Sequence, residues 1–198
     1  MNKKIIIGII AAVVIVAAIV LVVLFLGKEK LEEITLSLDI DYGDEIETAT
    51  ASIGYPKNAG VELKSNSDTT KEFEIKDKNC NLEISFVDEL ESTYDENMEA
   101  DKDEEGYKEI TFNGYKGYIL KGTYRVEGKI LLANDESNIN KVIEFTVEAI
   151  DDYIDDDFVD PEPLYNLKEV QTILKSVKYN GSTIVENPDE TEDMEVDE

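Results

Sequence analysis

Apolar and polar residues alternate along much of the chain. Residues 34–42, 80–86 and 143–149 each place apolar side chains at every second position, with polar side chains between them. A period of two is typical of a β-strand with one buried face. Cys80 falls on the apolar side of its strand, so we expect it to be a small core residue. A reactive thiol or an intermolecular disulfide is the alternative.

A tight hairpin is predicted where Asn113 and Gly114 separate two apolar runs, residues 110–112 and 115–120. Asn-Gly favours this turn because both residues tolerate a positive φ. The residues on either side are therefore expected to form two paired strands.

Helical spacing occurs in two places. Leu164, Leu167, Val170, Leu174 and Val177 recur at intervals of three and four, which predicts one amphipathic helix of about three and a half turns. Between residues 88 and 105, Leu90, Tyr94 and Met98 are spaced by four and predict a short helix with a narrow apolar stripe.

Residues 5–26 contain no polar side chain. A bilayer core of about 30 Å requires about 20 apolar residues in a helix, so this segment is expected to be a transmembrane anchor. A cleavable signal peptide is the alternative, but its apolar region is usually only about 7–15 residues and ends in a small-residue cleavage site. Lysines flank the segment on both sides, and the free amino terminus slightly favours a cytoplasmic N-terminus with the following domain outside.

The predicted fold class is therefore α+β: an N-terminal transmembrane helix, then one mainly antiparallel β-sheet domain with a C-terminal packing helix. The expected divisions are a cytoplasmic N-terminus (1–4), a transmembrane anchor (5–26), a connector (27–33), an extracytoplasmic α+β domain (34–180) and an acidic disordered tail (181–198).

Composition narrows the possible functions. The net charge is −27, and all 46 acidic residues follow residue 26. Such a surface repels nucleic acid, so the expected partners are the lipid bilayer, through residues 5–26, and an unidentified protein. Histidine is absent, which excludes Ser-His-Asp and Cys-His catalysis and ordinary zinc sites. The single cysteine cannot form an internal disulfide.

The sequence Leu-Lys-Glu-Val-Gln-Thr-Ile-Leu-Lys-Ser-Val-Lys-Tyr at 167–179, following strands and an Asn-Gly hairpin, resembles the PsbP-like group of small extracytoplasmic proteins. Tyr55-Pro56-Lys57 is similar to an early strand end of that group. Val177 stands where the group commonly has an aromatic residue. The resemblance covers about residues 34–180 and implies an antiparallel sheet covered by helices. The group has no shared catalytic residues, so the resemblance implies no site.

Carboxylates are the only candidates for chemistry. An acidic stretch could bind calcium, which prefers oxygen ligands, and no other cofactor is expected; a solvated acidic loop is the alternative. The residues of this stretch are Asp151, Asp152, Asp155, Asp156, Asp157 and Asp160. Paired carboxylates could also hydrolyse glycosides. Tyr115 and Tyr118 of the hairpin are candidates for partner binding, with ordinary sheet packing as the alternative.

We therefore expect a non-enzymatic, membrane-anchored, extracytoplasmic binding or scaffolding domain. A calcium-binding surface domain is the second hypothesis, and a carboxylate-based hydrolase is the third.

Overall fold

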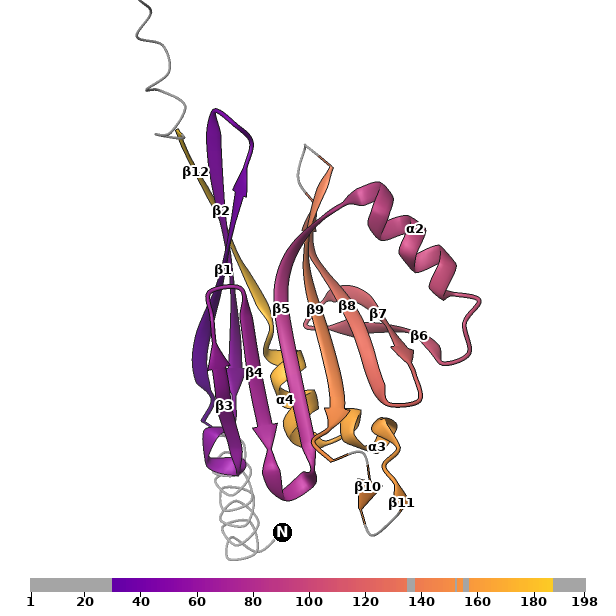
Figure 1. Cartoon of the computed structure of the whole chain (residues 1–198). Helices are drawn as coiled ribbons and strands as arrows, with labels where there is room; N and C mark the ends of the chain where they lie inside the picture. The colour runs from indigo at the N-terminus through magenta and orange to yellow at the C-terminus, as the bar shows by residue number, and fades with distance from the viewer. Residues whose placement is uncertain (1–29, 135–137, 152, 155–156, 187–198) are drawn as a thin grey trace, which may run out of the picture. The chain divides into compact units, whose positions relative to one another are not determined.

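The computed structural model describes residues 30–134, 138–151, 153–154 and 157–186 (Figure 1). Its strands are β1 (Glu32–Asp41), β2 (Glu45–Tyr55), β3 (Val61–Asn66), β4 (Thr70–Ile75), β5 (Cys80–Leu90), β6 (Tyr107–Phe112), β7 (Tyr115–Lys121), β8 (Arg125–Asn134), β9 (Ile139–Ala149), β10 (Tyr153–Ile154), β11 (Asp157–Phe158) and β12 (Lys178–Glu186). Its helices are α2 (Glu91–Asp101), α3 (Pro161–Tyr165) and α4 (Lys168–Ser176).

Two antiparallel sheets organise these elements. The larger sheet has seven strands in the order β3-β4-β5-β9-β8-β7-β6, and the smaller has the order β1-β2-β12. β10 and β11 form a separate two-stranded ribbon. The N–H of Ser37 in β1 donates to the carbonyl of Asp68, in the β3–β4 turn, at 2.9 Å. This bond connects an edge of the smaller sheet to the larger one.

The seven-stranded sheet has two different faces. On β9, Ile143 belongs to the main apolar core, whereas its neighbour Val142 belongs to a second, smaller cluster with Tyr94 and Tyr118. We call the face that carries Ile143 the inner face and the face that carries Val142 the outer face. Figure 1 shows α2 on the side of this sheet away from β1 and β2.

The main core lies among the inner face, the three-stranded sheet and α4. Val170, Ile173 and Leu174 of α4 are completely buried, and α4 packs on β2. At its end, the Ser176 Oγ accepts the N–H of Gly54 at 2.7 Å and lies 2.8 Å from the Gly54 carbonyl. The predicted apolar stripe is therefore the contact that attaches this helix to the small sheet.

A buried ion pair crosses the core between the two sheets. The Lys141 Nζ of β9 lies 2.9 Å from a Glu47 carboxylate oxygen of β2, and the two side chains are 1% and 6% exposed. The Tyr42 hydroxyl also donates to Glu47, at 2.9 Å. Burial opposes ionisation of Glu47, but hydrogen bonds from Ser182, Lys141 and Tyr42 prevail and hold the pKa of its carboxyl below the usual range.

The predicted hairpin is confirmed. β6 pairs with β7 around Asn113 and Gly114, whose φ angles are +50° and +88°. Close packing also explains Gly117 of β7, because a Cβ there would lie only 2.0 Å from the carbonyl oxygen of Lys129. The next strand can approach β7 this closely only because position 117 has no side chain.

The predicted fold class is wrong in two respects. The described residues form mainly antiparallel β-structure divided between two sheets, rather than one sheet with a packing helix. Within residues 30–134, 138–151, 153–154 and 157–186, no helix combines the length and apolarity needed to cross a bilayer, so the structure does not support the transmembrane helix. The segment on which that prediction rested, residues 5–26, lies outside the described residues.

Two boundaries also differ from the predictions. The helix expected over 164–177 is divided into α3 and α4 around Asn166 and Leu167. β12 continues to Glu186, so β-structure extends beyond the predicted domain end at residue 180. The smaller sheet recruits these residues by pairing them with Glu45 to Thr50 of β2, a long-range contact that local composition does not reveal.

Candidate functional site

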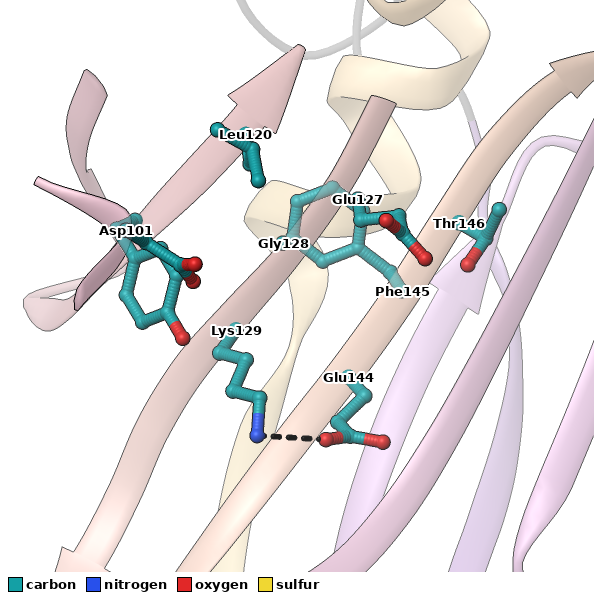
Figure 2. A pocket seen from close by; sticks show the side chains of 9 residues that line it. Asp101, Leu120, Glu127, Gly128, Lys129, Glu144, Phe145 and Thr146 are labelled. Atoms are coloured by element: carbon teal, nitrogen blue, oxygen red, sulfur yellow. Dashed lines mark ion pairs between the residues drawn. The ribbon is translucent and has the colours of Figure 1, made fainter. Parts of the chain in front are cut away.

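A hollow of about 270 Å³ opens on the outer face, beside the C-terminal end of α2. We call it the outer hollow. Figure 2 shows Asp101 on one side of it and the paired Lys129 and Glu144 on the other. Its lining residues are Asp101, Tyr118, Leu120, Glu127, Gly128, Lys129, Glu144, Phe145 and Thr146. Most of them come from the neighbouring strands β7, β8 and β9, so the sheet fixes their spacing.

Lys129 is the cation of the outer hollow. Its Nζ lies 2.9 Å from both carboxylate oxygens of Glu89 and 2.9 Å from one oxygen of Glu144. Burial alone would lower the pKa of Lys129, but the bonds to Glu144 and Glu89 outweigh it and raise this pKa. Lys129 therefore stays protonated near neutral pH and cannot serve as a nucleophile or a base.

Tyr118 forms the wall of the outer hollow beneath α2. It is 3% exposed, its ring stacks on Tyr107 at 5.6 Å between centroids, and it meets the edge of Tyr94 at 6.2 Å. Burial, followed by the negative charge of Asp101 and a hydrogen bond with it, raises the pKa of the Tyr118 hydroxyl. This hydroxyl therefore remains protonated and serves as a hydrogen-bond donor.

Carboxylates extend from the hollow across the outer face. Glu72 of β4 lies directly opposite Glu83 of β5, and Glu83 in turn faces Thr146, which faces Glu127. Like charges directly opposite each other destabilise a sheet. The outer face therefore carries an unfavourable concentration of negative charge, which the ion pairs Lys64–Glu74, Arg125–Glu127 and Lys129–Glu144 compensate only in part.

A second cavity of about 580 Å³ lies between α2 and strands β6 to β8. Tyr94 and Met98 of α2 line it together with Thr111, Gly117 and Leu131 of the sheet. The contact between α2 and the sheet is therefore bordered by open space on this side as well.

The two predicted partner-binding tyrosines lie on opposite faces. Tyr115 packs against the main core, and its hydroxyl accepts the N–H of Tyr179 at 3.1 Å. Tyr118 belongs to the outer cluster with Tyr94. The two side chains therefore do not form a common surface, and only Tyr118 contributes to the outer hollow.

The predicted calcium ligands are only partly described. Asp152, Asp155 and Asp156 lie outside the described residues, as does the side chain of Asp157. The Asp151 N–H binds the Asn79 Oδ1 at 2.9 Å. Asp160 caps α3 by accepting the Glu162 N–H at 3.0 Å, and it lies 3.4 Å from the Lys121 Nζ. Among the described residues, no three acidic or cysteine side chains are grouped as a metal site.

Hydrogen bonds hold the pKa values of the Glu32, Glu47 and Asp160 carboxyl groups below their usual range. A glycosidase needs one carboxyl group with a raised pKa to act as its general acid. These three groups are therefore unsuited to that role.

Sequence reasoning missed Lys129, Glu144 and Asp101. Lys129 and Glu144 occupy the polar positions of alternating strands, where a solvated charge is the ordinary expectation. Only the register, which pairs these two residues directly, brings them together. The sequence offers no signal at Lys129, because residues 115–134 contain four basic residues and one acidic residue.

No family model matches the chain, and neither the curated proteins nor the solved structures contain a significant match to it.

Proposed function

We propose that this chain is a non-catalytic binding module that docks a basic protein segment on the outer face of its seven-stranded sheet. The segment would present lysine or arginine side chains, one of which enters the outer hollow. The proposal rests mainly on the opposed carboxylates Glu72 and Glu83, whose repulsion a cationic partner would relieve.

The protonation states in the hollow support binding rather than catalysis. Lys129 and Tyr118 both remain protonated, so neither can take a proton from a substrate. The acceptors that the hollow offers to a lysine or arginine side chain are the carboxylates of Asp101, Glu127 and Glu144. The volume of about 270 Å³ suits a single long side chain better than a drug-sized ligand, whose pockets begin at about 300 Å³.

The test is a titration of the full-length chain, in mild non-ionic detergent, with a lysine- and arginine-rich peptide. Neutralising Glu83 and Glu127 (Glu83→Gln with Glu127→Gln) should weaken binding about three- to tenfold, because each exposed ion pair contributes about 0.2–1 kcal/mol. The matched control neutralises exposed Glu33 and Glu186, both on the smaller sheet.

The control variant has the same net charge but should bind the peptide like the unmodified chain. Equal weakening in both double variants would show that the peptide responds only to net charge, and the proposal would then be wrong. Binding to the unmodified chain should also weaken as salt is added, because surface ion pairs are screened.

The predicted location outside a cell membrane is a separate matter, because it depends on residues 5–26 and no described residue bears on it. It remains a prediction from the sequence. Fractionation of cells that express the chain with and without residues 1–29 tests it. Recovery of both forms in the soluble fraction would contradict it.

A further inference from the structure

Helix α2 is attached to the outer face by few side chains. Tyr94 is its only buried residue, and the ring of Tyr94 meets the edge of Tyr118. Asn97 donates to Glu89 at 2.9 Å in an exposed hydrogen bond. Partly buried Met98, a hydrogen bond between Asp101 and the Tyr118 hydroxyl, and a bond of 2.8 Å from the Glu91 N–H to the Asn138 carbonyl add to this attachment. With one buried side chain, an eleven-residue helix still gains little from apolar burial.

Two buried polar atoms on this face have no hydrogen-bond partner among the described residues, the Tyr107 hydroxyl and the Asn140 Oδ1. Tyr107 packs in the cluster that contains Tyr94. Asn140 is 1% exposed and pairs with Glu89, the residue bonded to α2. A buried polar atom without a partner disfavours the closed arrangement, because water would satisfy it once the helix moved away.

The charges of α2 also oppose its helical form. Its N-cap position is Leu90, which offers no capping side chain and is 57% exposed. Its last turn contains Glu99 and Asp101 and no basic residue; Lys102 at the C-cap pairs with Glu99 at 2.7 Å and leaves Asp101 uncompensated at the helix end. Carboxylates at a helix C-terminus interact unfavourably with the helix dipole. Cavities of about 270 and 580 Å³ border the same helix.

We propose that α2 is a lid that opens as a unit in the free protein and uncovers an aromatic floor for the basic segment. The floor consists of Val87, Tyr107, Tyr118, Leu131 and Val142. Tyrosine faces attract lysine and arginine through cation–π contacts. The floor therefore extends the part of the outer hollow that keeps Glu127 and Glu144 after Asp101 has moved with α2. The identity of the partner rests on the proposed function, whereas the opening is a property of the chain alone.

Amide hydrogen exchange on the full-length chain, with no peptide present, tests the opening. Amides of α2 should exchange at least about a hundredfold faster than those of β5 and β9, because local opening requires far less free energy than global unfolding. Exchange of α2 at the same rate as β5 and β9 would overturn the lid.

Two tyrosine variants test the cause of the opening. Replacing Tyr107 by phenylalanine (Tyr107→Phe) removes an unsatisfied hydroxyl and should slow exchange in α2 about tenfold without changing β5. Tyr124→Phe, at an exposed residue between β7 and β8, is the control and should leave α2 unchanged. Unchanged or faster exchange of α2 in Tyr107→Phe would contradict the proposed origin of the opening.

The same variant links the lid to binding. If the segment requires the open form, Tyr107→Phe should weaken peptide binding by the factor by which it slows exchange. Slower exchange with unchanged affinity would show that α2 opens but does not gate the site. An opening lid in a chain that binds no peptide would remove the proposed function and leave the lid intact.

Discussion

The inner and outer faces of the seven-stranded sheet are covered by helices of similar length and very different attachment. On the inner face, Val170, Ile173 and Leu174 of α4 are completely buried, and Ser176 fixes the helix end to Gly54. On the outer face, α2 buries only Tyr94. The amount of apolar surface buried by each helix therefore distinguishes α4, which is firmly attached, from α2, which is suited to move.

Each face also carries a lysine–glutamate ion pair, and the two pairs differ in burial. Lys141 on the inner face is 1% exposed and pairs with Glu47, whereas Lys129 on the outer face is 19% exposed and pairs with Glu89 and Glu144. The inner pair joins two sheets inside the core. The outer pair borders the outer hollow, where Glu144 is 42% exposed to water.

The largest expected effect concerns these two lysines. Replacing Lys141 by methionine (Lys141→Met) should lower the free energy of unfolding by about 3–5 kcal/mol, because Glu47 is left buried without its counter-ion. Lys129→Met should cost less, about 1–3 kcal/mol, because Glu144 is 42% exposed to water, although Glu89 is only 11% exposed. Urea unfolding of the full-length chain measures both, and equal losses would remove the distinction between the faces.

The next largest loss of stability is expected in the main core. Leu174→Ala should cost about 3 kcal/mol, within the range of about 2–5 kcal/mol for truncating a buried leucine. Met98 of α2 is partly buried and packs against the second cluster. Met98→Ala should therefore lower the free energy of unfolding clearly less in the same urea experiment. A Met98→Ala loss as large as that of Leu174→Ala would show that α2 is as firmly attached as α4.

A smaller effect is expected at the end of α4. Ser176→Ala leaves the Gly54 N–H without its bond and should cost about 1–2 kcal/mol. Thr35→Ala, at an exposed position on β1, is a control that should remain within about 0.5 kcal/mol. A loss in Ser176→Ala no larger than in this control would mean that the bond to Gly54 does not stabilise the helix end.

Acid should weaken the ion pair between Glu47 and Lys141, and the stability of suitable variants should show this. The pKa of Glu47 is lowered from 4.5, so its charge stabilises the fold above that pH, and this stabilisation is lost as the pH falls through the folded value. The stability difference between the unmodified chain and Glu47→Gln should therefore shrink below pH 4.5. A difference that stays constant from neutral to acidic pH would contradict this assignment.

Local patterns predicted the local parts of the fold. The spacing of Val170 and Leu174 gave α4, and Asn113-Gly114 gave the β6–β7 hairpin, because helices and tight turns depend on neighbouring residues. Tyr94 and Met98 likewise predicted α2. These segments contain the side chains that determine their conformation.

Long-range pairing could not be predicted in this way. Lys141 occupies the inner-face position before Ile143 and Phe145, which marks it as a buried lysine, but nothing nearby indicates Glu47 as its partner. The division into two sheets and the continuation of β12 to Glu186 depend on the same kind of contact. The outer hollow was missed for this reason: its members approach one another only after β7, β8 and β9 have paired.

Cys80 gives the molecule a built-in reporter. It is completely buried, as the alternation predicted, and burial raises the pKa of its thiol to about 12. A thiol reagent should therefore leave the native protein unlabelled and modify it only when the core itself opens. Cys80 is the only cysteine in the sequence, so the rate at which the protein is alkylated measures how often the core opens. Movements of α2 do not contribute to this rate, because Cys80 lies in the main core.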